Sequence, residues 1–267
     1  MIHSPTAWLR GAGGTPFGRH EGRGPIDLMA DAARQALASS ALARGDIDGM
    51  LCGYATTLPH LMLSTLLCER FGLSPRYAHG MQLGGATGAA MLMAARELVR
   101  AGRCRNVLVV AGENRLTGQS RDSSIQTLAQ VGDADYEVPN GASVPAYYAL
   151  MASEYMHRTG ITRADLAEFA VLMRANAARH PEAHLRTPIT QAEVLASKPI
   201  AAPLSLLDCC PISDGAMALV VSAEPGPHAP VRMAGAGQAH RHQHLPAMAD
   251  VMRCGAGRSL ASAICRW

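Results

Sequence analysis

The sequence predicts an α/β fold, a layered βαβαβαβ domain on a mixed sheet with a helical loop insertion. Between residues 8 and 111, short apolar runs typical of buried strands alternate with longer segments of helical periodicity. Residues 117–200, in contrast, show only polar and helical patterns. The composition, 48% hydrophobic and 17% charged, supports a sizeable core.

The first two strands and the helix between them are predicted from the first 53 residues. Residues 8–18 form a short strand that ends in a glycine-rich loop, whose glycine spacing does not fit a dinucleotide-binding fingerprint. Pro25 suits the first position of a helix running to about residue 43. The more apolar face of that helix carries Met29, Ala33 and Leu37. Residues 48–53 are expected to be a buried strand.

The same alternation continues to residue 111. A helix is expected over residues 59–71, ended by Gly72, and a strand over residues 76–83. A buried helix over residues 85–101 and a strand over residues 107–111 follow. Strands separated by helices in this order predict that most of the sheet is parallel.

The middle of the chain is predicted to be helical. Residues 117–135 are polar and irregular, and residues 145–160 form a helix that opens with proline. Thr162 and Asp165 resemble a capping box, with Asp in place of the usual Glu or Gln. The helix that they open is stopped by Pro181.

The chain then returns to the sheet. Residues 216–222 are continuously apolar, as expected for a strand in a central, buried position. Residues 231–235 start one more strand, and residues 249–267 are expected to enter a helix.

Charge and composition exclude several classes of protein. The net charge is only +3 and no block of Lys or Arg occurs, so we expect no nucleic-acid partner. No apolar run is long enough to cross a bilayer and no signal peptide is recognisable, so we expect a cytoplasmic protein without membrane contact. The seven cysteines are irregularly spaced, which indicates free thiols, with Cys209 and Cys210 buried and inert.

Four motifs occur in an order that resembles one family. They are the glycine-rich loop after residue 10, the Gly84–Gly88 turn, the strand ending in Gly112-Glu113-Asn114, and the run from Pro203 to Ala216. Together they resemble the thiolases, in particular the sterol-carrier-protein-linked, lipid-transfer-like branch.

The resemblance implies a nucleophilic cysteine at the start of the 85–101 helix, where this sequence has Gly85. A thiolate there would be activated by the helix N-terminus and would carry the acyl group. Because Gly85 has no side chain, we expect no thiolytic or condensing activity and name no catalytic residue. The motifs of the family's C-terminal half do not occur in the sequence either.

The resemblance also implies the ligand and the organisation of the chain. A CoA thioester is the expected substrate or ligand, with no further cofactor and no metal. The domains expected are an N-terminal α/β domain (1–116), a helical loop insertion (117–200), a return strand (201–223), and a linker with the truncated start of a C-terminal half-domain (224–267). Two further functions remain open: part of a retro-aldolase acting on β-hydroxyacyl-CoA, with a small OB-fold partner, or a non-catalytic CoA-binding or assembly subunit.

Four residues are candidates for substrate binding. Thr87 follows the nucleophile position and is expected to bond the backbone rather than to react. His79 lies in the 76–83 strand, through which thiolases pair, so we expect a homodimer through this strand. Ser143 and Tyr147 lie where the family's insertion contacts CoA.

Other polar residues are expected to be structural. Glu113 and Asp214 stand near strand ends and are expected to accept hydrogen bonds that stabilise turns. The alternating His240, His242 and His244 could bind a metal if extended, but a loop is the expected structure. We also expect an exposed apolar patch around the 85–101 helix and the 216–222 strand.

Overall fold

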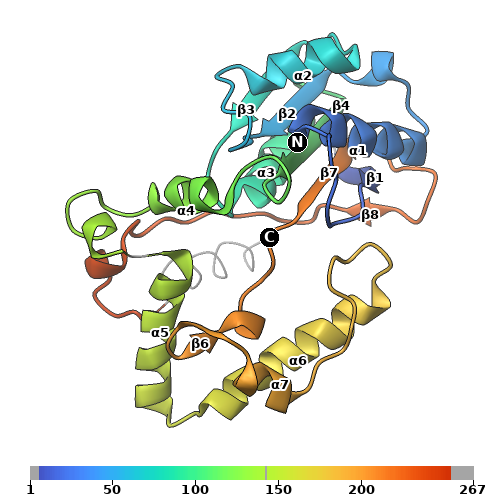
Figure 1. Ribbon diagram of the computed structural model, residues 1–267. Coiled ribbons are helices and arrows are strands. Elements are labelled where there is room, and N and C mark those ends of the chain that lie inside the picture. The colour runs from blue at the N-terminus through green and yellow to red at the C-terminus, as the bar shows by residue number, and fades with distance from the viewer. Residues whose placement is uncertain (1–5, 142, 254–267) are drawn as a thin grey trace. The chain divides into compact units, whose positions relative to one another are not determined.

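The computed structural model describes residues 6–141 and 143–253, which form two compact units (Figure 1). The first unit contains the described residues up to Gly118 and the segment Ser213–Gln238. The second contains Gln119–Ile212 and the described residues from Ala239 onward. No helix in these described ranges is both long and apolar enough to cross a membrane.

The first unit is built on a six-stranded mixed sheet. The strand order is β3-β2-β4-β7-β1-β8. The strands are β1 (Trp8–Gly14), β2 (Gly49–Gly53), β3 (Tyr77–Met81), β4 (Asn106–Asn114), β7 (Asp214–Ser222) and β8 (Val231–Arg232).

The expected mixed sheet is confirmed, but the expectation that most of it is parallel is wrong. Among the strand pairs of the described residues, only β2–β3 and β2–β4 are parallel. The β4–β7, β7–β1 and β1–β8 pairs are antiparallel. The reason is that β7 re-enters the sheet after the helical insertion, in the opposite direction to β4.

Helices cover both faces of the sheet (Figure 1). Two of them, α1 (Pro25–Ser40) and α2 (Leu63–Phe71), share one apolar cluster with Met50 and Cys52 of β2. A second cluster joins α3 (Thr87–Arg100) to Leu51, which points to the other face. With both faces covered, β2, β4 and β7 read as continuous apolar runs, and β7 is central as predicted.

The glycines of β1 bring α1 close to the sheet. A Cβ on Gly13 would lie 2.4 Å from Ala36 N and 2.5 Å from Ala32 O. This close contact explains why the buried side of α1 is wider than the expected Met29, Ala33 and Leu37 face. The helix also buries Leu28, Ala32 and Ala36 completely.

Two elements differ from their predicted ranges in physically informative ways. Helix α2 begins at Leu63 rather than near residue 59, and Leu61 is fully exposed. The segment expected to be irregular contains α4 (Arg121–Ala129), capped by Ser120, whose side chain accepts from Ser123 N. Helix α4 buries only Ser124, so it carries no apolar periodicity that could have revealed it.

The second unit contains the predicted helices of the insertion. Gly160 ends α5 (Val144–Thr159) at a φ of 76°. The capping box that opens α6 (Arg163–Arg179) is present, with the Thr162 side chain accepting from Asp165 N. The unit also contains α7 (Gln191–Ala196), a two-stranded sheet of β5 (Pro199–Ala201) and β6 (Leu204–Ser205), and the 3-10 turns η2 (Val138–Asn140), η3 (Leu206–Asp208) and η4 (Leu245–Ala247).

The last described segment is irregular. Residues 240–244 form no strand, and residues 249–253 form a turn rather than the start of a helix. The rest of the helix expected over residues 249–267 lies outside the described residues.

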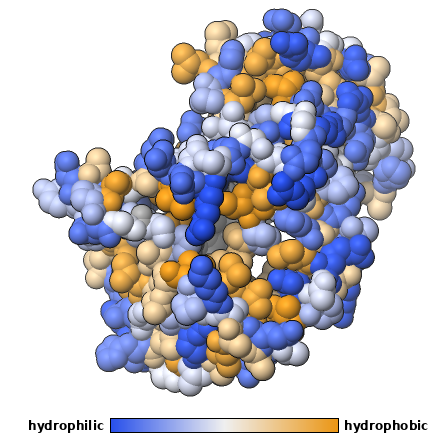
Figure 2. Space-filling view, viewed as in Figure 1, coloured by the Kyte–Doolittle hydropathy of each residue, from blue (hydrophilic) through white to orange (hydrophobic). Residues whose placement is uncertain are grey.

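The expected apolar patch is not present at the 216–222 strand. Ala216, Ala218, Val220 and Val221 are at most 2% exposed because helices cover both faces of β7, and only Met217 is substantially exposed. In the face shown in Figure 2, hydrophilic and apolar residues are interspersed.

Candidate functional site

A tight turn joins β3 to α3 at the position where the resemblance described above implies a nucleophile. Gly84 adopts a φ of 54°, a conformation that favours glycine. The Thr87 hydroxyl donates to Gly84 O at 2.7 Å and accepts from Leu83 N at 2.9 Å. The Thr87 side chain is buried, so its hydroxyl holds the turn together in this structure.

Gly85 is exposed and has room for a side chain. A Cβ built on Gly85 meets no atom within 4 Å, and the residue has no positive φ. Neither steric crowding nor backbone conformation therefore requires glycine here. Position 85 could therefore hold a larger residue without strain.

The N-terminus of α3 offers free hydrogen-bond donors beside Gly85. Thr87 N and Ala90 N have backbone partners, whereas Gly88 and Ala89, both exposed, have no hydrogen bond from their amides in the described chain. These amides open a helix of 14 residues. Free N–H groups and the helix dipole together favour a negative charge at this point.

Glu113, at the end of β4, holds the loop after β2 in place. Its Oε2 accepts from Thr56 N at 2.6 Å and from Thr56 Oγ1 at 2.7 Å. Its Oε1 accepts from Thr57 N at 3.3 Å and from the Thr57 hydroxyl. These bonds give Glu113 a turn-stabilising role.

Asp214 has a similar role at the start of β7. It is fully buried, and Oδ1 accepts from Leu116 N at 2.7 Å and from Thr117 N at 3.2 Å. Oδ2 accepts from His20 N at 3.0 Å and from Thr117 Oγ1 at 2.8 Å. Burial opposes ionisation of Asp214, but the bonds from His20 and Thr117 outweigh it and lower its pKa.

The described cysteines of the first unit are buried thiols with raised pKa values. Burial raises the pKa of Cys52 to about 12, and it also raises the pKa values of Cys68 and Cys104. All three are buried, and at neutral pH such thiols are protonated. In the second unit the expectation of burial is wrong: Cys209 is half-buried and Cys210 exposed, because both lie in the coil between η3 and β7.

The structure places the other candidate residues on two elements. His79 is exposed on the edge strand β3, with its ring centroid 6.2 Å from that of Tyr77. Ser143 is the N-cap residue of α5, but its side chain makes no capping bond. Tyr147 lies one turn further along α5 and lines a pocket of about 350 Å³ with Glu137 and His244.

That pocket was not foreseen from the sequence. His244 Nδ1 lies 2.9 Å from Glu137 Oε2, although the two residues are 107 positions apart. No local signal in the sequence points to such a contact. Across the described ranges, no three His, Cys, Asp or Glu side chains gather closely enough to hold a metal ion.

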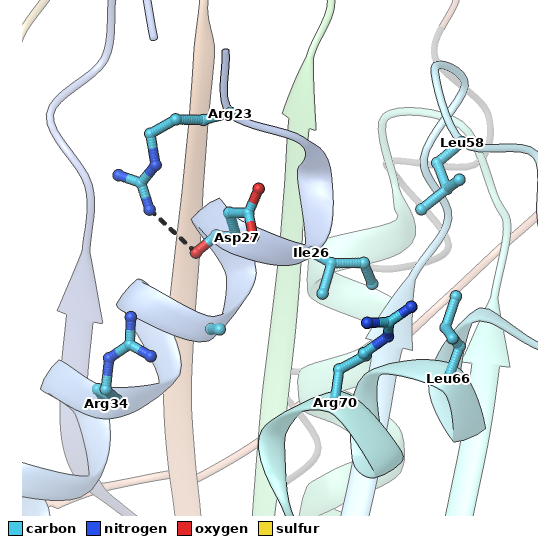
Figure 3. A pocket seen from close by; sticks show the side chains of 8 residues that line it. Arg23, Ile26, Asp27, Arg34, Leu58, Leu66 and Arg70 are labelled. Carbon is cyan, nitrogen blue, oxygen red and sulfur yellow. Dashed lines mark hydrogen bonds between the residues drawn. The ribbon is translucent and has the colours of Figure 1, made fainter. Parts of the chain in front are cut away.

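A second cavity, of about 600 Å³, lies on the α1–α2 side of the first unit (Figure 3). Arg23 and Arg34 line it, but both pair with Asp31. Arg70 points into the same space beside Ile26 and has no partner in the described chain. A single exposed guanidinium does not by itself define a binding site, because solvent screens an exposed charge.

The chain matches the family model "Thiolase, N-terminal domain" over residues 9–225, and it therefore belongs to the thiolase family. The predicted family and fold class are confirmed by this match.

Several relatives are similar over most of the chain. An acetyl-CoA acetyltransferase of Methanocaldococcus jannaschii is 32% identical over 79% of this chain and 54% of its own length. A steroid side-chain-cleaving aldolase of Thermomonospora curvata is 33% identical over 90% of this chain and 63% of its own. Sterol carrier protein 2 of Bos taurus is 24% identical over 80% and 41%.

Among solved structures, the "Ltp2-ChsH2(DUF35) aldolase" has a TM-score of 0.82 at 26% identity. The match covers 98% of this chain and 69% of that one. The chain thus spans a little over half the length of the curated relatives named first.

Proposed function

We propose that this protein acts on acyl-CoA thioesters as a carbon–carbon lyase of the retro-aldol type, without forming an acyl-enzyme at position 85. The observation that carries the proposal is Gly85 itself: an open, unstrained position at the start of α3 with no nucleophilic atom. Support also comes from the names of two similar proteins, each described as an aldolase.

Retro-aldol cleavage needs no thiolate. A base removes the proton of the β-hydroxyl group, the Cα–Cβ bond breaks, and its electron pair moves to the α-carbon as a thioester enolate. Protonation of that carbon yields a ketone or aldehyde and a shortened acyl-CoA. The developing charge lies on the thioester oxygen, where preorganised N–H donors are most effective.

The turn at Gly85 is suited to that charge. The free amides of Gly88 and Ala89 supply the donors, and the absence of a side chain at residue 85 leaves room for the thioester. The turn supplies no base. We propose that the base comes from another part of the assembly, which includes a small OB-fold partner subunit.

The remaining binding roles are proposed from the placement of the candidates. Ser143, the N-cap residue of α5, would contact the neutral pantetheine part of CoA, whereas Tyr147 lines the separate pocket of Glu137 and His244. The edge strand β3 pairs only with β2 in the described chain, and four of its five residues are exposed. We propose that a second copy pairs along this strand, over residues 76–83.

The alternative is a non-catalytic CoA-binding or assembly subunit. The open edge of β3 favours it, because an unpaired strand can join subunits whether or not the site turns over.

Product analysis separates the two functions. The purified chain, alone and with a DUF35-type partner, is incubated with a panel of β-hydroxyacyl-CoA thioesters, and products are identified by mass spectrometry. A ketone or aldehyde with a shortened acyl-CoA supports the lyase. Saturable CoA binding without turnover supports the binding subunit, and thiolysis of acetoacetyl-CoA by free CoA would overturn both.

A further inference from the structure

We propose that the second unit has a ligand site of its own, in which Glu137 and His244 present a histidine nitrogen to the hydroxyl group of a compact, neutral, apolar molecule. The inference concerns the pocket beside α5 alone, and it does not rest on the lyase function.

The pocket has the size and the lining of a small-molecule site. Its volume of about 350 Å³ lies within the usual range for such sites, about 300–1,000 Å³. Most of the wall is apolar. Five of the apolar lining residues are Val131, Val144, Met151, Leu245 and Met248. The polar lining residues are Glu137, His242, Gln243 and His244, and Tyr147 and Tyr148 add two hydroxyl groups.

Glu137 is an ionised carboxylate, and one of its two oxygens lacks a hydrogen-bond donor. It is only 7% exposed. Its Oε2 accepts from Asp133 N at 2.7 Å, and this bond, with the nearby His244, holds the pKa of the carboxyl group below its usual value. Its Oε1 is buried and has no hydrogen-bond partner in the described chain. A buried acceptor without a donor is costly, so Glu137 Oε1 calls for a partner that can donate a hydrogen bond to it.

Glu137 fixes the tautomer of His244. A carboxylate can only accept, so Nδ1 must donate to Glu137 Oε2 across 2.9 Å. In the neutral ring Nε2 then carries the lone pair and becomes an acceptor. Nε2 has no partner in the described chain, and the side chain is 35% exposed, so a ligand can reach it.

Tyr147 keeps the carboxylate in place. Its hydroxyl lies beside Glu137, and both burial and the carboxylate raise the pKa of Tyr147, so the hydroxyl stays protonated at neutral pH. Gly132 allows this arrangement, because a Cβ there would lie 2.4 Å from the Tyr147 oxygen. Asp133 and Tyr147 thus position Glu137, and Glu137 positions His244.

The chemistry of the ligand follows from these acceptors. Glu137 Oε1 and His244 Nε2 both require a hydrogen-bond donor, and the negative charge of Glu137 disfavours phosphates and carboxylates. The apolar wall favours a saturated ring body over a polar one. The hydroxyl of a neutral alicyclic alcohol donates one hydrogen bond, to the accessible His244 Nε2, and its ring body fits the apolar wall.

The tautomer is tested first, on the unmodified chain. Nitrogen-15 NMR of histidine-labelled protein at pH 8 reports which ring nitrogen of His244 carries the proton. The proposal predicts the Nδ1–H form, and loss of that preference in Glu137→Gln. An Nε2–H form in the unmodified protein would overturn it.

Binding is tested with decahydro-2-naphthol and with decahydronaphthalene, which lacks the hydroxyl group. His244→Phe should weaken alcohol binding about five- to tenfold, the value of one neutral hydrogen bond, and leave hydrocarbon binding unchanged. The matched control is His240→Phe, since His240 is exposed in the same segment and does not line the pocket. It should change neither affinity.

Three results would refute the site. They are no saturable binding of the alcohol, equal weakening of both probes in His244→Phe, and tighter binding of 2-aminodecahydronaphthalene than of the alcohol. If His244→Phe does not fold, the tautomer measurement on the unmodified chain still tests whether Glu137 holds His244 in the Nδ1–H form.

Discussion

Replacing Asp214 by asparagine should destabilise the first unit by about 2–6 kcal/mol. The carboxylate accepts four hydrogen bonds, two on each oxygen, in a fully buried position. Asparagine turns one of these oxygens into an NH₂ group, which faces two donors that it cannot satisfy. Each buried donor left without an acceptor costs about 1–3 kcal/mol, which gives the sum.

Urea unfolding measures this loss. Trp8 on β1 provides a fluorescence signal from the first unit. The matched control is Glu69→Gln, because Glu69 is exposed on α2 and its side chain has no partner in the described chain. A loss for Asp214→Asn no larger than that of the control would refute the assigned role.

The same carboxylate predicts a pH dependence. Its pKa is lower in the folded state than in the unfolded state, so its contribution to stability is fully present above the unfolded value of about 3.9. The contribution is lost as the pH falls from there through the folded pKa. Between pH 7 and pH 3 the unmodified protein should therefore lose more stability than Asp214→Asn, and parallel curves would contradict this.

Three further substitutions test the turn and the close helix packing. Gly85→Cys should fold normally, within about 0.5 kcal/mol, because the added side chain meets open space. Its thiol at the helix N-terminus should react with iodoacetamide at pH 7 while Cys52, with a pKa near 12, does not; peptide mass spectrometry distinguishes them. Gly13→Ala should cost about 1–3 kcal/mol in thermal unfolding, since its Cβ would collide with the backbone of α1. Thr87→Val should cost about 1–2 kcal/mol by breaking the Leu83–Gly84 turn, and an unchanged melting temperature would contradict that role.

Elements with strong local signals could be predicted from the sequence. Three features were predicted from neighbouring residues alone and are present in the structure. They are the capping box at Thr162, the glycine that ends α5, and the apolar run of β7. Helix α4 could not be found in this way, because it buries almost nothing and lacks an apolar stripe. The antiparallel entry of β7 depends on where the insertion returns the chain, which periodicity does not encode.

In the candidate site, too, contacts between residues close in the sequence could be predicted, and contacts between distant residues could not. The turn around Gly85 was visible because its motif is contiguous, and Thr87 bonds residues three and four positions away. The Glu137–His244 pair joins residues 107 positions apart, and each residue alone looks like an ordinary polar loop residue. The hydrogen-bond donors at Gly88 and Ala89 are backbone N–H groups, so no pattern of side chains in the sequence predicts them.

The most direct test of the central claim is intact-protein mass spectrometry after incubation with acetoacetyl-CoA, followed by peptide mapping. The account predicts that the first unit remains unmodified, because residue 85 has no atom to acylate and the buried thiols of this unit are protonated. An acyl group mapped to any residue of the first unit, formed and then discharged by free CoA, would contradict it.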